Sequence, residues 1–180
     1  MELKELKLEM KIDEEKVFIG HDFLNQTVSN IPDIKENKKI FNILAQSNLT
    51  YARDIVSSSD NLSKESFKIL MNDAVDEIVC NLLDNNKATQ YFTDEIVENI
   101  LAKDNTKLNI KIAENIGEFK LCNIPKFINK LVTNVSSEVR YSLMSYSNTD
   151  FISMEQMELL SKDLDIDVSK KAKEELSDMR

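Results

Sequence analysis

Five segments of this chain share a similar order of apolar and polar residues. They are ILAQS (43–47), ILMND (69–73), ILAKD (100–104), KLVTN (130–134) and LLSKD (159–163), and the second-position leucines stand 26 to 31 residues apart. A nearly constant period of this length predicts an internal structural repeat. Three positions after each leucine stands a short polar residue of a type that favours turns and helix starts. These five residues are Ser47, Asp73, Asp104, Asn134 and Asp163.

A second apolar stripe follows each turn residue. The positions eight after the leucines hold Ala52, Ile78, Asn109, Val139 and Val168, and those twelve after hold Val56, Leu82, Ala113, Leu143 and Ala172. Positions four apart share one face of a helix, so each segment predicts a helix, a turn and a second helix. Asn109 is the exception and indicates a small slip in phase. Leu101, in the middle of the series, is predicted to lie in the core.

The first helix of each unit also has start signals. An apolar residue precedes a capping hydroxyl at Leu62-Ser63, Phe92-Thr93 and Ile152-Ser153. If the hydroxyl residue is the N-cap, the preceding apolar side chain meets Phe67, Val97 or Met157 one turn later, as in a hydrophobic staple. In the fourth unit Pro125 takes this role, because proline fits the first turn of a helix.

The combined pattern, L-x-x-D-x-x-x-x-V-R-x-x-A/L, resembles the repeats of HEAT-type and leucine-rich-repeat-variant α-solenoids. It is most complete in one copy, at Leu131, Asn134, Val139, Arg140 and Leu143, and only Arg53 and Arg140 occupy the arginine position nine after the leucine. The resemblance covers residues 36–180. It implies an all-α fold, an α-α superhelix (HEAT-like solenoid) of about five two-helix repeats.

Residues 1–35 stand outside the repeat and are predicted to form an N-terminal cap segment of the same single domain, because solenoid ends need polar caps. Residues 1–12 fit either a strand or a helix, since Leu6, Leu8, Met10 and Ile12 alternate while Leu3, Leu6 and Met10 have helical spacing. Any strand is expected within residues 5–12. A helix is expected over residues 13–30, with Gly20 as its weak point.

Composition narrows the class of protein. The 180 residues include only two glycines and two prolines, which favours helices over an all-β fold, and the net charge is -9. Of the 23 basic residues three are arginine, and no basic stripe is visible, which argues against nucleic acid as the partner. The acidic N-terminal residues do not fit a signal peptide, and no apolar run is long enough for a membrane span. We expect a soluble, cytoplasmic and bacterial protein, the last from its many Lys, Asn and Ile residues.

Residues with catalytic or metal-binding chemistry are few. His21 is the only histidine, and an ordinary boundary histidine is the simpler interpretation. Cys80 is either an exposed thiol or, more simply, a small packed side chain. The alternating Asp163, Asp165 and Asp167 resemble part of a calcium loop, but the glycine that such a loop requires is missing. We therefore expect no catalytic residue, no metal site and no cofactor.

The remaining hypothesis is a binding surface. In the solenoids that the chain resembles, second helices line the concave face where partners dock. The outward positions nine, ten and thirteen after the leucines then supply the candidate partner-binding residues Arg53, Asp54, Lys111, Glu114, Arg140 and Tyr141. Arginine and tyrosine are enriched at binding hot spots, so Arg140 with Tyr141 is a candidate anchor. In the alternative, Arg140 pairs with the turn acid of an adjacent unit and Tyr141 only covers an apolar edge.

These observations favour a protein-binding adaptor, scaffold, assembly factor or regulator whose partner is another protein. The alternative is a HEAT-like enzyme or a nucleic-acid-handling protein, because a fold does not specify a function. The sequence leaves the oligomeric state open.

Overall fold

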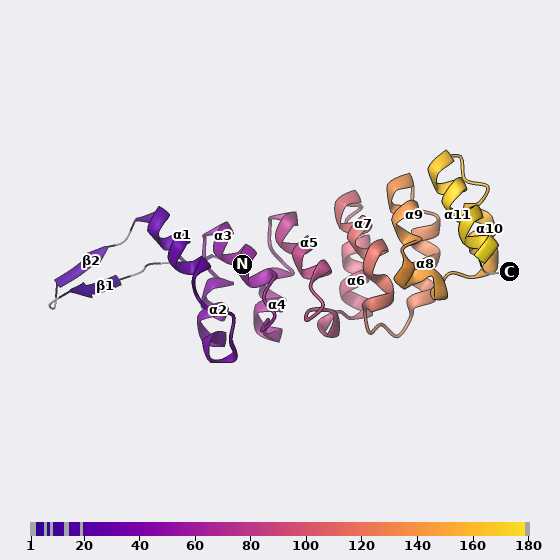
Figure 1. Cartoon of the computed structure of the whole chain (residues 1–180). Helices are drawn as coiled ribbons and strands as arrows, with labels where there is room; N and C mark the ends of the chain where they lie inside the picture. The colour runs from indigo at the N-terminus through magenta and orange to yellow at the C-terminus, as the bar shows by residue number, and fades with distance from the viewer. Residues whose placement is uncertain (1–2, 6, 8, 13–14, 19, 179–180) are drawn as a thin grey trace. The chain divides into compact units, whose positions relative to one another are not determined.

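The computed structural model describes residues 3–5, 7, 9–12, 15–18 and 20–178, and α-helices make up most of them (Figure 1). The predicted all-α class is therefore confirmed for the bulk of the chain. Contacts divide the chain into two compact units, Met1–Ala88 and Thr89–Arg180. The division of a single domain into a cap of residues 1–35 and a repeat region of residues 36–180 stays a prediction.

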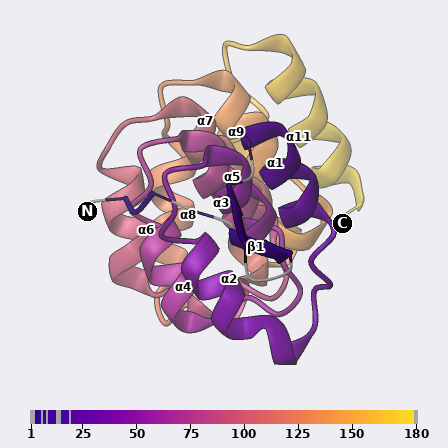
Figure 2. The ribbon, with the colours of Figure 1, turned by 90° about the vertical axis from the view of Figure 1, so that its left-hand side faces the viewer.

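The first unit begins with a β-hairpin that the sequence analysis missed in part. Strand β1 (Glu9–Ile12) pairs with β2 (Glu15–Phe18) in antiparallel register. The strand alternative for residues 9–12 is thus confirmed. The expectation that strand is confined to residues 5–12 is wrong, because β2 forms at residues 15–18, where a helix was expected. Val17 and Phe18 are of types enriched in strands, and the pairing with β1 outweighs the helical spacing. Helix α1 (His21–Ser29) begins only after Gly20 and packs against α3 (Figures 1 and 2).

The rest of the first unit consists of two helix pairs. A short 3-10 turn, η1 (Lys35–Asn37), leads into α2 (Lys38–Leu44), which is followed by α3 (Thr50–Ser57), α4 (Lys64–Leu70) and α5 (Asp76–Asp84). Helix α2 contacts α4, and α3 contacts α5, so first helices lie beside first helices and second beside second.

The second unit contains three further helix pairs. In chain order it has η2 (Thr89–Tyr91), α6 (Asp94–Leu101), α7 (Thr106–Asn115), η3 (Ile116–Glu118), α8 (Ile124–Val132), α9 (Ser137–Leu143), η4 (Tyr146–Phe151), α10 (Met154–Leu160) and α11 (Ile166–Asp178). Helix α9 packs between α7 and α11, and α8 contacts α10. The predicted alternation of first and second helices is therefore present in this unit too.

The helix starts follow the predicted caps. The side chains of Ser63, Thr93 and Ser153 each accept a hydrogen bond from the backbone N–H three residues later, and Ser153 forms a complete capping box with Gln156. Pro125 lies in the first turn of α8. The apolar staple residues around these caps are all buried: Leu62, Phe67, Phe92, Val97, Ile152 and Met157. Local sequence and tertiary packing thus agree at the start of these helices.

The third helix pair, α6–α7, departs from the predicted repeat register by one residue. Ile100 is 3% exposed, whereas Leu101 is only half-buried, so the prediction that Leu101 lies in the core is wrong. Asn105 caps α7 by accepting the Leu108 N–H at 3.3 Å, and it stands five residues after Ile100. Asp165 stands five residues after the buried Leu160 and accepts the Val168 N–H at the start of α11 in the same way. Counted from Ile100, the positions eight and twelve later are Leu108 and Ile112, which are buried, and the predicted positions Asn109 and Ala113 are buried as well.

One connection in the second unit is held by the side chain of Asn148 together with that of Ser145, whose Oγ donates to the Glu114 carbonyl oxygen at 2.8 Å. The amide of Asn148, in η4, is fully buried; it donates to the backbone oxygens of Ala113 and Leu143 and accepts from the Gly117 N–H at 2.9 Å. These bonds satisfy carbonyl groups at the C-terminal ends of α7 and α9, which a helix leaves without internal partners. Asn148 therefore fixes η4 against both helices.

In the part of the chain that the structure describes, no helix is long and apolar enough to cross a membrane.

Candidate functional site

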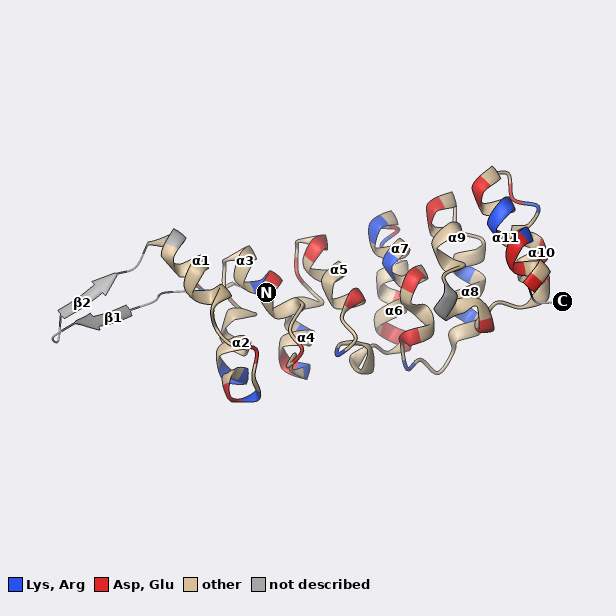
Figure 3. Ribbon diagram, in the orientation of Figure 1, with Lys and Arg blue, Asp and Glu red and all other residues tan. Residues whose placement is uncertain are grey.

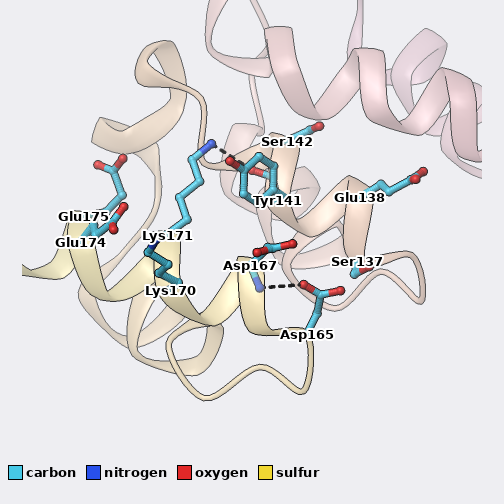
Figure 4. Close-up of a pocket in the computed structure, with 10 residues that line it drawn as sticks. All are labelled: Ser137, Glu138, Tyr141, Ser142, Asp165, Asp167, Lys170, Lys171, Glu174 and Glu175. Atoms are coloured by element: carbon cyan, nitrogen blue, oxygen red, sulfur yellow. Dashed lines mark hydrogen bonds between the residues drawn. The ribbon is translucent and has the colours of Figure 1, made fainter.

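An open groove of about 780 Å³ lies between α9 and α11 in the second unit (Figure 4). Its lining residues come from one face of each helix: Ser137, Glu138, Tyr141 and Ser142 from α9 and Asp165, Asp167, Lys170, Lys171, Glu174 and Glu175 from the start and length of α11. Volumes of this size are typical of ligand sites, although this groove is more polar than most.

The helical period explains why these side chains face the groove. In α9, Val139 and Leu143 are fully buried, which turns Tyr141, between them in sequence, away from the core. In α11, Val168 and Ala172 are fully buried, and the polar residues of that helix remain outside. Both signs of charge therefore lie together on the exposed face of α11 (Figure 3).

The ring of Tyr141 already holds a cation. Lys171 Nζ lies 4.2 Å from the ring centroid, within the range of a cation–π interaction, and donates to the Tyr141 carbonyl oxygen at 3.4 Å (Figure 4). Partial burial lowers the pKa of the Lys171 ammonium, while the charge of Glu175 opposes that effect. The tyrosine side chain nevertheless stays 43% exposed.

Carboxylates outnumber ammonium groups in the groove by five to two. Asp165 has a structural role: its bond from the Val168 N–H and then its bond from Ser137 lower its pKa, and it also accepts the Asp167 N–H at 3.0 Å. Within residues 20–178, by contrast, no ion pair engages Glu138, Asp167 or Glu174. The groove therefore carries negative charge that its own lysines leave uncompensated.

Arg53, a predicted binding residue, lies inside the first unit. It is 3% exposed, and its Nε donates to Asp73 Oδ2 at 2.6 Å while Nη1 donates to the Ser47 carbonyl oxygen at 2.9 Å. The expected outward placement is wrong, because the position nine after the leucine lies over the turn, where carbonyl and carboxylate oxygens receive the guanidinium. Arg53 holds the turn between α2 and α3 to the turn between α4 and α5.

Arg140 makes the equivalent set of bonds in the second unit. Its Nε and Nη2 donate to the two Asp163 oxygens at 2.7 and 2.8 Å, and Nη1 donates to the Asn134 carbonyl oxygen at 2.6 Å. The bond from Arg140 is the main cause that lowers the pKa of Asp163. We call these two arrangements the turn clamps: Arg53 with Ser47 and Asp73, and Arg140 with Asn134 and Asp163. The alternative in which Arg140 pairs with the adjacent turn acid is thus confirmed.

The six candidate residues do not form one site. Asp54 accepts the Asn81 side-chain amide at 2.6 Å in the first unit, and Lys111 pairs with Glu114 at 2.9 Å on α7. Arg140 and Tyr141 diverge, the first toward the turn and the second into the groove. Of the six, only Tyr141 lines the groove.

The other chemical candidates have structural positions or lie outside the description. Cys80 is 2% exposed, as expected for a packed side chain, and Cys122 is exposed. Among the described residues, no group of three or more His, Cys, Asp or Glu side chains is arranged to hold a metal ion. The side chain of His21 lies outside the described part of the chain.

The groove residues of α11 were missed by the sequence analysis. The outward position ten after the leucine, counted from Leu160, is Lys170, which does line the groove. Applying the same offset to the last unit would therefore have found this helix. The contact of Lys171 with Tyr141 has no such signal, because it joins residues thirty positions apart.

Comparison with protein-family models gave no match, and no curated protein and no solved structure is significantly similar to the chain.

Proposed function

We propose that this protein is a non-enzymatic adaptor or scaffold that binds another protein through the groove between α9 and α11. The observation that carries the proposal is the exposed Tyr141 ring on a helix face turned away from the core. Tyrosine is enriched among the residues that dominate binding energy, because it combines a large apolar surface with a polar end.

The arrangement of helices supports a HEAT-like α-solenoid as the underlying fold. Second helices contact second helices, α3 with α5 and α9 with both α7 and α11, as expected when each helix pair buries its apolar face against its neighbours. The two turn clamps recur at the same position in their helix pairs. In such a fold the second helices offer a continuous surface for a partner, and Tyr141 is on one of them.

The experiment is capture of interacting proteins from native cells with tagged wild-type chain and two variants. Tyr141→Ala should lose the captured protein, because removing a hot-spot aromatic costs about 2 kcal/mol or more in binding. Tyr51→Ala is the matched control: Tyr51 lies on α3 and is also 43% exposed, but outside the groove.

Thermal midpoints of all three chains show whether the fold is retained, since exposed substitutions usually change stability by about 0.5 kcal/mol or less. Equal capture by wild type and a folded Tyr141→Ala variant would contradict the proposed site. Loss of capture with both tyrosine variants would also contradict it, because the effect would not belong to the groove.

A further inference from the structure

The groove between α9 and α11 has features that select the chemistry of its partner. The Tyr141 ring binds a cation, and among the described residues that cation is Lys171, a side chain of the protein itself. Aromatic rings flanked by carboxylates are the usual recognition elements for ammonium and guanidinium groups. The site therefore presents cation-binding elements that an internal lysine occupies.

Lys171 is held on the ring by weak interactions. Its Nζ lies 3.4 Å from the Tyr141 carbonyl oxygen, which is a long hydrogen bond, and within residues 20–178 it forms no ion pair with any carboxylate. A cation–π contact at an exposed ring is weak, because water still solvates the cation. A second cation that also reaches the carboxylates would therefore compete successfully for the ring.

The carboxylates are only partly explained by helix structure. Glu138 and Asp167 lie in the first turns of α9 and α11, where the helix dipole favours negative charge. Glu174 and Glu175 lie toward the other end of α11, where the dipole disfavours negative charge, and the last turn of α11 contains no basic residue. The helix dipole therefore does not account for Glu174 and Glu175, and both line the groove.

We propose that the groove between α9 and α11 binds a lysine or arginine side chain of a basic partner segment, and that Lys171 occupies the place of that side chain on Tyr141 until the partner arrives. This inference rests on the proposed function. The cation would stack on Tyr141. Glu138 and Glu174, on opposite sides of the groove in Figure 4, would form ion pairs with neighbouring basic side chains of the same segment.

Isothermal titration with a blocked tetra-arginine peptide tests the proposal, with a tetra-glutamate peptide as the chemical control. The arginine peptide should bind the wild-type chain and lose affinity as salt is added, because exposed charges are screened. Lys171→Met should tighten binding about two- to fivefold by freeing the ring, and Lys171→Gln serves as a second variant of the same kind. Circular dichroism confirms that each variant is folded.

Glu174→Gln should weaken binding of the arginine peptide, whereas Glu155→Gln should not. Glu155 is an exposed glutamate on α10 outside the groove, so the two variants reduce the net negative charge of the protein equally. Equal weakening by both would mean general attraction to an acidic protein and would overturn the proposal. Binding that Lys171→Met and Lys171→Gln leave unchanged would overturn the role of Lys171.

The failure of this inference is distinguishable from failure of the proposed function. If no arginine peptide binds but Tyr141→Ala still loses its cellular partner, the adaptor function stands and the basic ligand is wrong. If a folded Tyr141→Ala variant keeps its partner, the groove is not the docking site.

Discussion

Replacing Arg53 by methionine is the most direct test of a turn clamp. The substitution keeps a long side chain but removes the guanidinium, which leaves the Asp73 carboxylate without its cation and the Ser47 carbonyl without its donor. The side chains of the pair are only 4% and 5% exposed, so water cannot replace the lost bonds. Removing one partner of a buried ion pair costs about 3–5 kcal/mol, a large part of the stability of a domain.

A double variant isolates the interaction energy between Arg53 and Asp73. Asp73→Asn keeps an oxygen that can accept the Val75 N–H, a bond of 3.0 Å in the structure. Arg53→Met combined with Asp73→Asn leaves no buried charge, so it should cost less than the sum of the two single variants. We expect a coupling energy of about 1–3 kcal/mol, as found for residues in direct contact.

Urea unfolding followed by circular dichroism measures these free energies, and hydrogen exchange assigns the loss to residues 38–84. Lys126→Met is the control, because the Lys126–Glu98 pair has a similar distance of 2.9 Å but side chains 43% and 45% exposed. Such an exposed pair contributes little to stability, because water and salt screen it. A midpoint shift for Arg53→Met no larger than that of Lys126→Met would refute the clamp as a source of stability.

Three further predictions concern the second unit, with unfolding as the measurement. Asn109→Val should raise the free energy of unfolding by about 1 kcal/mol, since the buried Asn109 Oδ1 has no hydrogen-bond partner among the described residues; a lower free energy of unfolding would contradict this. Asn148→Asp should cost about 3 kcal/mol or more at neutral pH, because a carboxylate cannot donate to the Leu143 carbonyl oxygen; an unchanged thermal midpoint would contradict the role of Asn148 in fixing η4. Arg140 lowers the folded pKa of Asp163 below its ordinary value of 3.8, so the pair stabilises the fold above about pH 5 and loses that effect as pH falls through the folded pKa. Asp163→Asn should therefore be less stable at neutral pH but lose less stability on acidification; parallel pH curves would contradict the assignment.

Much of the fold could be predicted because its determinants are local. Ser63, Thr93 and Ser153 are capping residues beside apolar residues, and each begins a helix in the structure. The hairpin was harder, because its strands are stabilised by pairing with each other rather than by a residue pattern along one segment. The shifted core position, Ile100 instead of Leu101, depends on where Asn105 caps the next helix.

The candidate site was predictable only in part. Helical period places Tyr141 outward correctly, but the same reasoning places Arg53 on the surface, where it does not lie. Arg53 is buried because an arginine side chain is long enough for its guanidinium to turn back over the end of the helix. There it reaches carbonyl oxygens whose position cannot be found by counting residues along the sequence. The alternative interpretation of Arg140 was correct for the same reason.

The turn clamps also define which helix pairs can separate alone. Each clamp ties one turn to the turn of the following pair, so α2–α3 cannot peel away from α4–α5, nor α8–α9 from α10–α11, without breaking an ion pair. The corresponding positions in the two intervening pairs hold Val79 and Ile110, which cannot make such a tie. Under mechanical load, α2–α5 and α8–α11 would therefore each detach as a clamped block of four helices. Two arginines thus decide which helix pairs come apart together.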